Sequence, residues 1–107
     1  MGWAVTFLNA DVAAELAALP ADIRARFGRI AMLIESHGLE RVHEPHVKHL
    51  DERIWEIRMT GRDGIARALY VTATRKRVVV VHVSVKKTQK VPRHDIELAK
   101  QRAKEVV

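Results

Sequence analysis

The pattern of apolar and polar positions along the chain predicts a small sheet with helices packed against it. The most strand-like segment is residues 77–85, in which Val78 to Val81 run without a break and Val83 and Val85 alternate with polar residues. β-Branched residues pack well on a pleated surface, and an unbroken apolar run indicates burial on both faces. We therefore expect residues 77–85 to form the central strand of the sheet.

A second strand shows strict alternation, which places successive side chains on opposite faces. Within residues 54–59, one face carries Trp55, Ile57 and Met59, and the other carries Ile54, Glu56 and Arg58. Two further strands are expected at residues 3–8 and 65–72. By contrast, residues 39–53 are polar and interrupted by proline, so we expect a long loop there.

Three amphipathic helices complete the predicted fold. Apolar residues at helical spacing follow Asn9, Pro20 and Pro92. The stripes consist of Val12, Leu16 and Leu19, of Ile23, Phe27, Ile30 and Ile34, and of Ile96, Ala99, Ala103 and Val106. The element order β-α-α-β-β-β-α predicts an α+β fold. In it, a small, mostly antiparallel sheet packs against a helical hairpin and a C-terminal helix, in a single domain spanning residues 1–107.

Charge narrows the function classes. Nineteen Lys and Arg against thirteen Asp and Glu give a formal net charge of +6, which favours a polyanion or an acidic protein as partner. The sequence contains no cysteine, which excludes disulfides and thiolate metal sites. No apolar run approaches the roughly 20 residues needed to span a membrane, and the N-terminus lacks the basic region of a signal peptide. A cytoplasmic protein is expected.

Five basic residues are candidates for phosphate binding. Lys86, Lys87 and Lys90 directly follow the predicted central strand, while Arg58 and Arg67 lie on neighbouring strands of the same meander. Because neighbouring strands of a meander pair, Arg58 and Arg67 can lie directly opposite each other or be offset by one position. Like charges held this close repel unless an anion joins them, which indicates a phosphate site.

The same two arginines allow a second interpretation. Arg58 and Arg67 could point outward from a solvated sheet face and pair with Glu56 or Asp63. In that arrangement the arginines would stabilise the sheet surface without binding a ligand. Spacing alone leaves both interpretations open.

The histidines offer little support for a metal site. His43, His46 and His49 recur every three residues, but Pro45 interrupts any helix that would align them. We expect instead a basic segment in which Lys48 and His49 contact a polyanion, with no metal and no cofactor.

Two further histidines differ in their expected surroundings. His82 lies within the apolar strand and is interpreted as a core residue. His94, at the start of the last helix, is either an exposed surface residue or a proton donor beside the lysines.

Several short motifs together resemble the phage-derived, HigB-like branch of the RelE toxin superfamily. These are W-E-I-R at Trp55–Arg58, an arginine followed by tyrosine at Arg67–Tyr70, V-K-K-T-Q-K-V-P at Val85–Pro92, I-E-L-A at Ile96–Ala99 and K-H-L at Lys48–Leu50. The most specific part is K-K-T-Q-K followed by a proline and a helix, and the likeness extends over nearly the whole chain. Two positions depart from the family pattern, since Val91 stands where a helix-capping threonine is common and Arg75 where a turn glycine is common.

The resemblance implies the toxin of a type II toxin–antitoxin system. Such toxins are compact, metal-independent mRNA endonucleases that generally act on the ribosome and inhibit translation. Each is neutralised by a cognate antitoxin, here HigA-like with a helix-turn-helix domain, and meets operator DNA only through that antitoxin. The alternative is a non-catalytic basic domain that binds RNA or protein.

The residue chemistry is compatible with RNA cleavage by attack of the ribose 2′-hydroxyl on the adjacent phosphate. Fixed cations stabilise the charge that gathers on the phosphorus oxygens in the transition state. We assign that task to Arg67 and Lys87, assisted by Arg58. The remaining expected contacts to RNA or phosphate are Lys86, Lys90, Lys48 and His49, and the candidates for proton transfer are Glu56 and His94.

Overall fold

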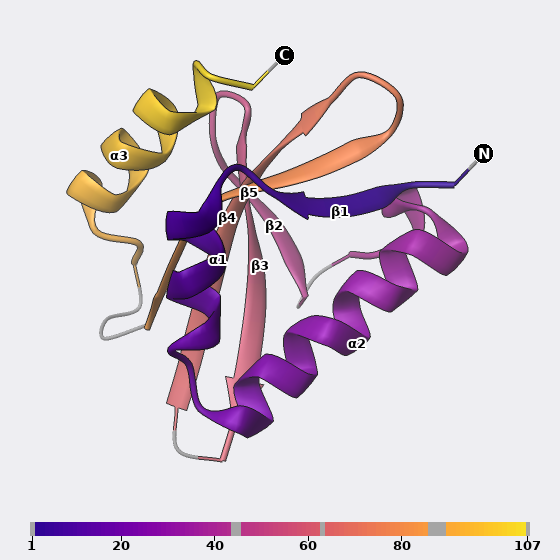
Figure 1. Cartoon of the computed structure of the whole chain (residues 1–107), viewed down its shortest axis with the longest axis vertical. Coiled ribbons are helices and arrows are strands. Elements are labelled where there is room, and N and C mark those ends of the chain that lie inside the picture. Colours follow the sequence, from indigo (N-terminus) through magenta and orange to yellow (C-terminus); the bar gives the residue numbers. More distant parts are fainter. Residues whose placement is uncertain (1, 44–45, 63, 86–89, 107) are drawn as a thin grey trace.

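The computed structural model of the chain describes residues 2–43, 46–62, 64–85 and 90–106 (Figure 1). The elements in chain order are β1 (Ala4–Phe7), α1 (Ala10–Ala17), α2 (Ala21–His37), a 3-10 turn (Leu39–Arg41), β2 (Val47–Asp51), β3 (Ile54–Gly61), β4 (Gly64–Ala73), β5 (Arg77–Val85) and α3 (Arg93–Ala103). The expected α+β fold with a mostly antiparallel sheet is confirmed. None of the helices in these ranges is long and apolar enough to cross a lipid bilayer.

The sheet has five strands in the order β1-β5-β4-β3-β2. Strand β1 pairs in parallel with β5, and the other neighbours pair antiparallel. Strand β5 is an interior strand, as its valine run predicts, although β4 occupies the middle of the sheet. The valine run packs on both faces, with Val78 and Val80 in one core and Val79 and Val81 in the other. A bulge opposite Leu69 and Tyr70 shifts the register of β5 by one residue and puts Val83 on the same face as Val80.

The prediction of a long loop over residues 39–53 is wrong. This segment contains the 3-10 turn and the edge strand β2, which pairs with β3. Pairing with β3 supplies the backbone hydrogen bonds of the strand, and only Val47 is fully buried within it. A register irregularity between His49 and Asp51 also breaks the two-residue alternation that would have revealed the strand.

Helices cover the two faces of the sheet unequally (Figure 1). Helices α1 and α2 pack on one face, where the predicted stripe of Ile23, Phe27, Ile30 and Ile34 joins Ile57 and Met59 of β3 in the larger core. Helix α3 packs on the other face, where Ala99 and Ala103 lie on Ile54, Leu69 and Val71. The next positions on that second face are polar, namely Glu56 and Arg58 on β3 and Arg67 on β4.

The start of α2 is fastened to the turn that joins β3 and β4. The Asp22 carboxylate accepts hydrogen bonds from the backbone N–H groups of Arg62, at 2.6 Å, and Ile23, at 3.0 Å. The bond from Arg62 is the main cause that lowers the pKa of Asp22 below its usual value. Gly61 makes this close approach feasible, because a β-carbon at that position would lie 2.7 Å from Asp22 Oδ2 and would contact Ile23 Cγ1.

We predict that Gly61→Ala lowers the free energy of unfolding by about 1–3 kcal/mol, because the added methyl group forces α2 away from the turn. Gly64→Ala is the matched control, since a β-carbon at Gly64 meets no atom within 4 Å. Urea denaturation of both variants measures the difference. Equal losses in the two variants would show that the contact between α2 and the turn is not tight.

Candidate active site

The register of β3 and β4 brings two arginines together on the α3 face of the sheet. Arg58 and Arg67 are direct cross-strand partners, as one of the predicted arrangements required. Glu56 precedes Arg58 by two residues and therefore lies on the same face. These three residues, hereafter the Glu56 cluster, occupy the part of the face next to the apolar patch under α3.

The carboxylate of Glu56 lies between the two guanidinium groups. Arg58 Nε is 3.5 Å from Glu56 Oε1, and Arg67 Nε is 3.3 Å from Glu56 Oε2. Glu56 and Arg67 are buried, each with 1% relative exposure, whereas the Arg58 side chain is 32% exposed. The arginines do pair with Glu56, as the second interpretation predicted. That interpretation also placed both arginines on a solvated face of the sheet, which is wrong for Arg67 because its side chain is buried.

Arg67 is a fixed internal cation. Its Nη1 donates a hydrogen bond of 3.2 Å to the backbone carbonyl of Lys90, which ties β4 to the segment before α3. Burial lowers the pKa of the Arg67 guanidinium, and the adjacent Glu56 carboxylate acts in the opposite direction. Because arginine stays protonated in proteins, the buried charge must be balanced, and the Glu56 carboxylate, with a smaller contribution from Asp95, acts in that direction.

Three cationic side chains, together with the Glu56 carboxylate, line a hollow above the cluster. Lys48 pairs across from Glu56 in the β2–β3 register, and Lys90 lies just before α3. Both lysines are exposed, and with Arg58 they line the same hollow as Glu56. Three apolar residues, Leu50, Val91 and Ile96, complete the wall. Lys86 and Lys87, the other predicted phosphate ligands, lie outside the described residues.

His49 is not brought to this hollow. It pairs with Trp55, so its side chain lies on the face of β2 opposite to Lys48. Its ring packs edge-on against Trp55 with centroids 5.0 Å apart, and its Nε2 lies 2.6 Å from the Glu52 carbonyl oxygen. Of the two residues expected to contact a polyanion from this segment, only Lys48 faces the Glu56 cluster.

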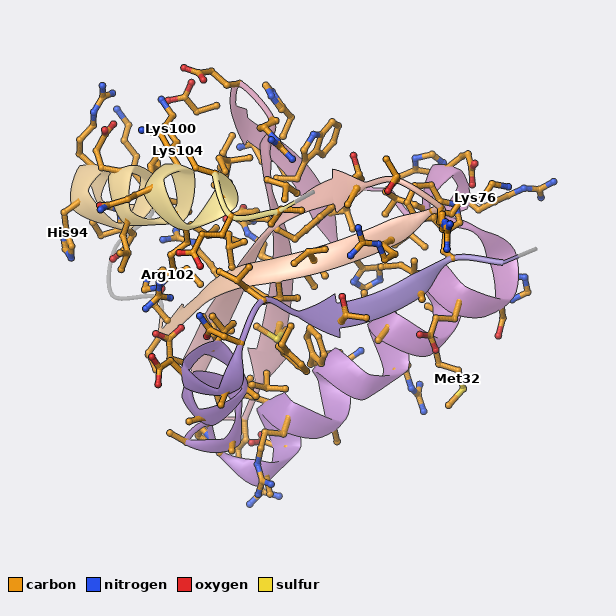
Figure 2. All side chains as sticks on the ribbon, turned by 45° about the horizontal axis from the view of Figure 1, so that its top comes forward. Met32, Lys76, His94, Lys100, Arg102 and Lys104 are labelled. Atoms are coloured by element: carbon orange, nitrogen blue, oxygen red, sulfur yellow. The ribbon has the colours of Figure 1, made fainter. Side chains whose placement is uncertain are left out.

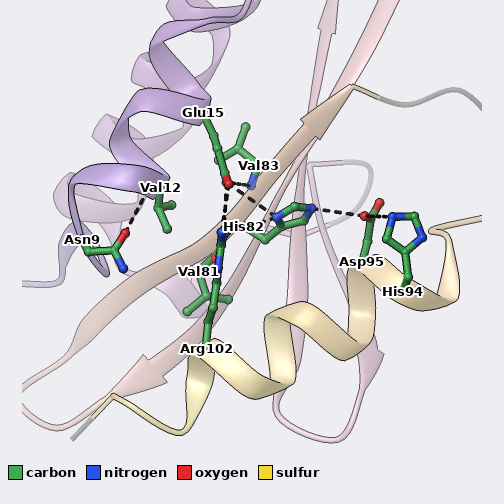
Figure 3. A network of polar contacts seen from close by, with 9 residues as sticks. All are labelled: Asn9, Val12, Glu15, Val81, His82, Val83, His94, Asp95 and Arg102. Atoms are coloured by element: carbon green, nitrogen blue, oxygen red, sulfur yellow. Dashed lines mark hydrogen bonds and ion pairs between the residues drawn. The ribbon is translucent and has the colours of Figure 1, made fainter.

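His94 belongs to a different polar network. It lies at the start of α3, largely exposed, and its Nε2 is 3.1 Å from Asp95 Oδ1 (Figures 2 and 3). Asp95 is buried, and the same oxygen lies 3.3 Å from Nε2 of His82, which is buried as expected for a core histidine. Of the two candidates for proton transfer, Glu56 is thus part of the cluster and His94 is not among the residues that line the hollow.

The network continues from His82 into α1 and the end of α3. His82 Nδ1 is 3.6 Å from Glu15 Oε1, which also accepts a hydrogen bond from the Val83 N–H. Arg102 pairs with Glu15 at 3.2 Å and donates to the Val81 carbonyl at 2.8 Å (Figure 3). The network therefore fixes α3 against β5 and α1. Sequence reasoning missed it, because no local pattern links positions as distant as 15, 82, 95 and 102.

The three spaced histidines do not meet. His43 lines an apolar hollow beside Trp3, His46 lies next to Arg58, and His49 packs on Trp55. Among the described residues, no group of three His, Asp or Glu side chains is arranged to hold a metal ion. Metal independence itself stays a prediction.

Comparison with known proteins agrees with the fold and the motifs. The family model "Phage derived protein Gp49-like (DUF891)" matches residues 14–104, a range that contains the whole Glu56 cluster. The crystal structure of an archaeal RelE–RelB complex from Pyrococcus horikoshii OT3 contains a chain with a TM-score of 0.58 at 20% sequence identity. That match covers 81% of this chain and 98% of the other. No curated protein matches the chain.

We predict that Glu56→Gln lowers the free energy of unfolding by about 3–5 kcal/mol, because it leaves the buried Arg67 charge without its carboxylate. Arg58→Gln is the control. Its partly exposed pair with Glu56 should cost about 1 kcal/mol or less. Denaturant unfolding of both variants provides the comparison, and a loss for Glu56→Gln no larger than for Arg58→Gln would contradict the role of Glu56 in balancing Arg67.

Proposed function

This chain belongs to the phage-derived Gp49-like family, and on that premise we propose that it is the toxin of a type II toxin–antitoxin system and cleaves mRNA. The observation that carries the proposal is the Glu56 cluster, in which a carboxylate between two guanidiniums faces a hollow rimmed by Lys48 and Lys90. This combination supplies a proton acceptor and several cations at one place. The RelE-like fold supports the assignment, since the similar archaeal structure is a RelE–RelB complex.

The proposed reaction needs no group beyond the RNA and the side chains. The 2′-oxygen forms a bond to the adjacent phosphorus while the bond from phosphorus to the 5′-oxygen breaks. Glu56 accepts the proton of the 2′-hydroxyl, and the leaving 5′-oxygen takes a proton from water or from a lysine ammonium of the rim. The products are a cyclic phosphate and a free 5′-hydroxyl end.

The cations have different tasks in this proposal. Arg58 lines the hollow and is partly exposed, so its guanidinium contacts the phosphate oxygens, together with Lys87. Arg67 is buried and acts through Glu56, which makes it a positioning residue that also adds positive potential. The phosphate contact is assigned from the sequence alone to Arg67 and Lys87. Because the Arg67 side chain is buried, we propose Arg58 for that contact instead.

The proposed partners follow from charge and from the family. The substrate is mRNA, bound on the ribosome in the cytoplasm. The formal net charge of +6 favours an acidic antitoxin, because complementary charge accelerates association and rejects wrong partners. We propose a HigA-like antitoxin with a helix-turn-helix domain, through which alone the toxin reaches operator DNA.

The test is inducible expression with and without the neighbouring antitoxin gene, with mRNA 5′ ends mapped. We predict that Arg58→Ala and Lys87→Ala each lower the cleavage rate about 10²–10³-fold, or roughly 3–4 kcal/mol, while RNA binding falls much less. Many cations share binding of the ground state, but few reach the phosphoryl oxygens as charge builds. Lys104→Ala, an exposed residue at the end of α3, is the control and should cleave like the wild type.

Two outcomes would overturn the proposal. If folded Arg58→Ala and Lys87→Ala variants cleave like the wild type, the active site lies elsewhere. If the wild-type protein binds RNA and leaves it intact, the chain is a non-catalytic RNA-binding domain.

A further inference from the structure

Arg58 lines two hollows. The first is the hollow above the Glu56 cluster, and the second is lined by Arg26, His46, Thr60 and Ile65 together with Arg58. The second hollow lies where α2 passes the end of β3, beyond the start of β2. A ligand that contacts Arg58 from the first hollow can therefore extend into the second without leaving the protein surface.

The described residues that line the second hollow include no acidic residue, whereas Glu56 lines the first. Two guanidiniums, one imidazole and one hydroxyl line the second hollow. Within the described ranges, no carboxylate lies at ion-pair distance from Arg26 or His46, and Glu56 is the one that pairs with Arg58. Arginine suits phosphate oxygens through its planar fork, and a hydroxyl can donate to a further oxygen.

A third hollow on the same molecule provides the contrast. It lies between α3 and the β2–β3 turn and contains Arg53, Lys100 and Lys104, but also Glu52 and Glu97. Lys100 Nζ is 2.9 Å from Asp51 Oδ2 and 3.3 Å from Glu52 Oε1. Its cations are thus already partly compensated. The second hollow, hereafter the Arg26 hollow, differs in that no acidic residue is among its described lining residues.

Backbone contacts hold the Arg26 hollow in place. The Arg58 N–H donates a 2.8 Å hydrogen bond to the His46 carbonyl, which keeps these two residues adjacent. Arg26 lies one turn after Asp22, whose carboxylate fastens α2 to the β3–β4 turn through the Arg62 N–H. The cations are consequently presented by rigid elements, which limits the entropy lost when an anion binds.

We propose that the Arg26 hollow is a second phosphate subsite, which binds a phosphodiester of the same RNA strand next to the one held at the Glu56 cluster. The inference rests on the proposed function, because it takes RNA as the ligand. Arg58 joins the two subsites, with Arg26 and Thr60 as the additional ligands of the second. The subsite would favour substrates longer than a dinucleotide.

The test measures binding of 2′-O-methyl oligoribonucleotides, which lack the attacking hydroxyl and stay intact. A dinucleotide has one internal phosphate and can fill only one subsite, whereas a hexanucleotide can reach both. For Arg26→Ala we expect about a three- to tenfold weaker affinity for the hexanucleotide and a salt slope smaller by about 0.7, with little change for the dinucleotide. Arg29→Ala removes the same charge one turn further along α2, from an exposed residue outside the hollow, and should change neither affinity.

The outcomes separate the two proposals. If Arg26→Ala and Arg29→Ala weaken hexanucleotide binding equally, or if Arg26→Ala leaves it unchanged, there is no subsite at this hollow. The proposed function is unaffected by that result when the wild type still cleaves RNA. If the wild type binds neither oligonucleotide and cleaves no mRNA, both the subsite and the proposed function are wrong.

Discussion

The placement of one carboxylate between two guanidiniums governs the polar face of this sheet. Glu56 and Arg67 are both buried, and a buried ion pair is stable only when its charges balance each other closely. The cross-strand register that pairs Arg58 with Arg67 places the Glu56 carboxylate at ion-pair distance from both guanidiniums, so these three side chains together carry a formal charge of +1. The cluster therefore retains positive charge and directs it, through the partly exposed Arg58, toward the hollow where an anion can bind.

The cluster is mechanically linked to the helix that bounds it. Arg67 donates to the Lys90 carbonyl, and α3 begins three residues later. At the other side, the chain of contacts from Glu15 through His82 to Asp95 fixes the start of α3 against β5 and α1 (Figure 3). Lys90 and the first turn of α3 are thus fastened to β4 and β5.

Much of the fold could be predicted from local patterns. Alternation in residues 54–59 correctly separated Glu56 and Arg58 from Ile57 and Met59, because strand geometry alone determines the face of each side chain. The stripe of α2 and the packing of Ala99 and Ala103 followed from helical periodicity in the same way. The edge strand β2 was missed, because a bulge interrupts its alternation and its stability comes from pairing with β3.

The site was predictable only in part, for a physical reason. A sequence shows which residues are charged but not which charges compensate one another in three dimensions. The burial of Arg67 depends on Glu56 eleven residues away, and the separation of His49 from Lys48 depends on a strand that was not foreseen. The Arg26 hollow combines residues of α2, β3, β4 and the segment before β2, so no local motif indicates it.

The chemistry of the RNA ends produced by the purified protein tests the central claim most directly. Cleavage that uses Glu56 and fixed cations should leave a cyclic phosphate at one end and a free hydroxyl at the new 5′ end. End-specific enzymatic labelling and mass spectrometry of the fragments identify both groups. Fragments with a 5′-phosphate would contradict the account.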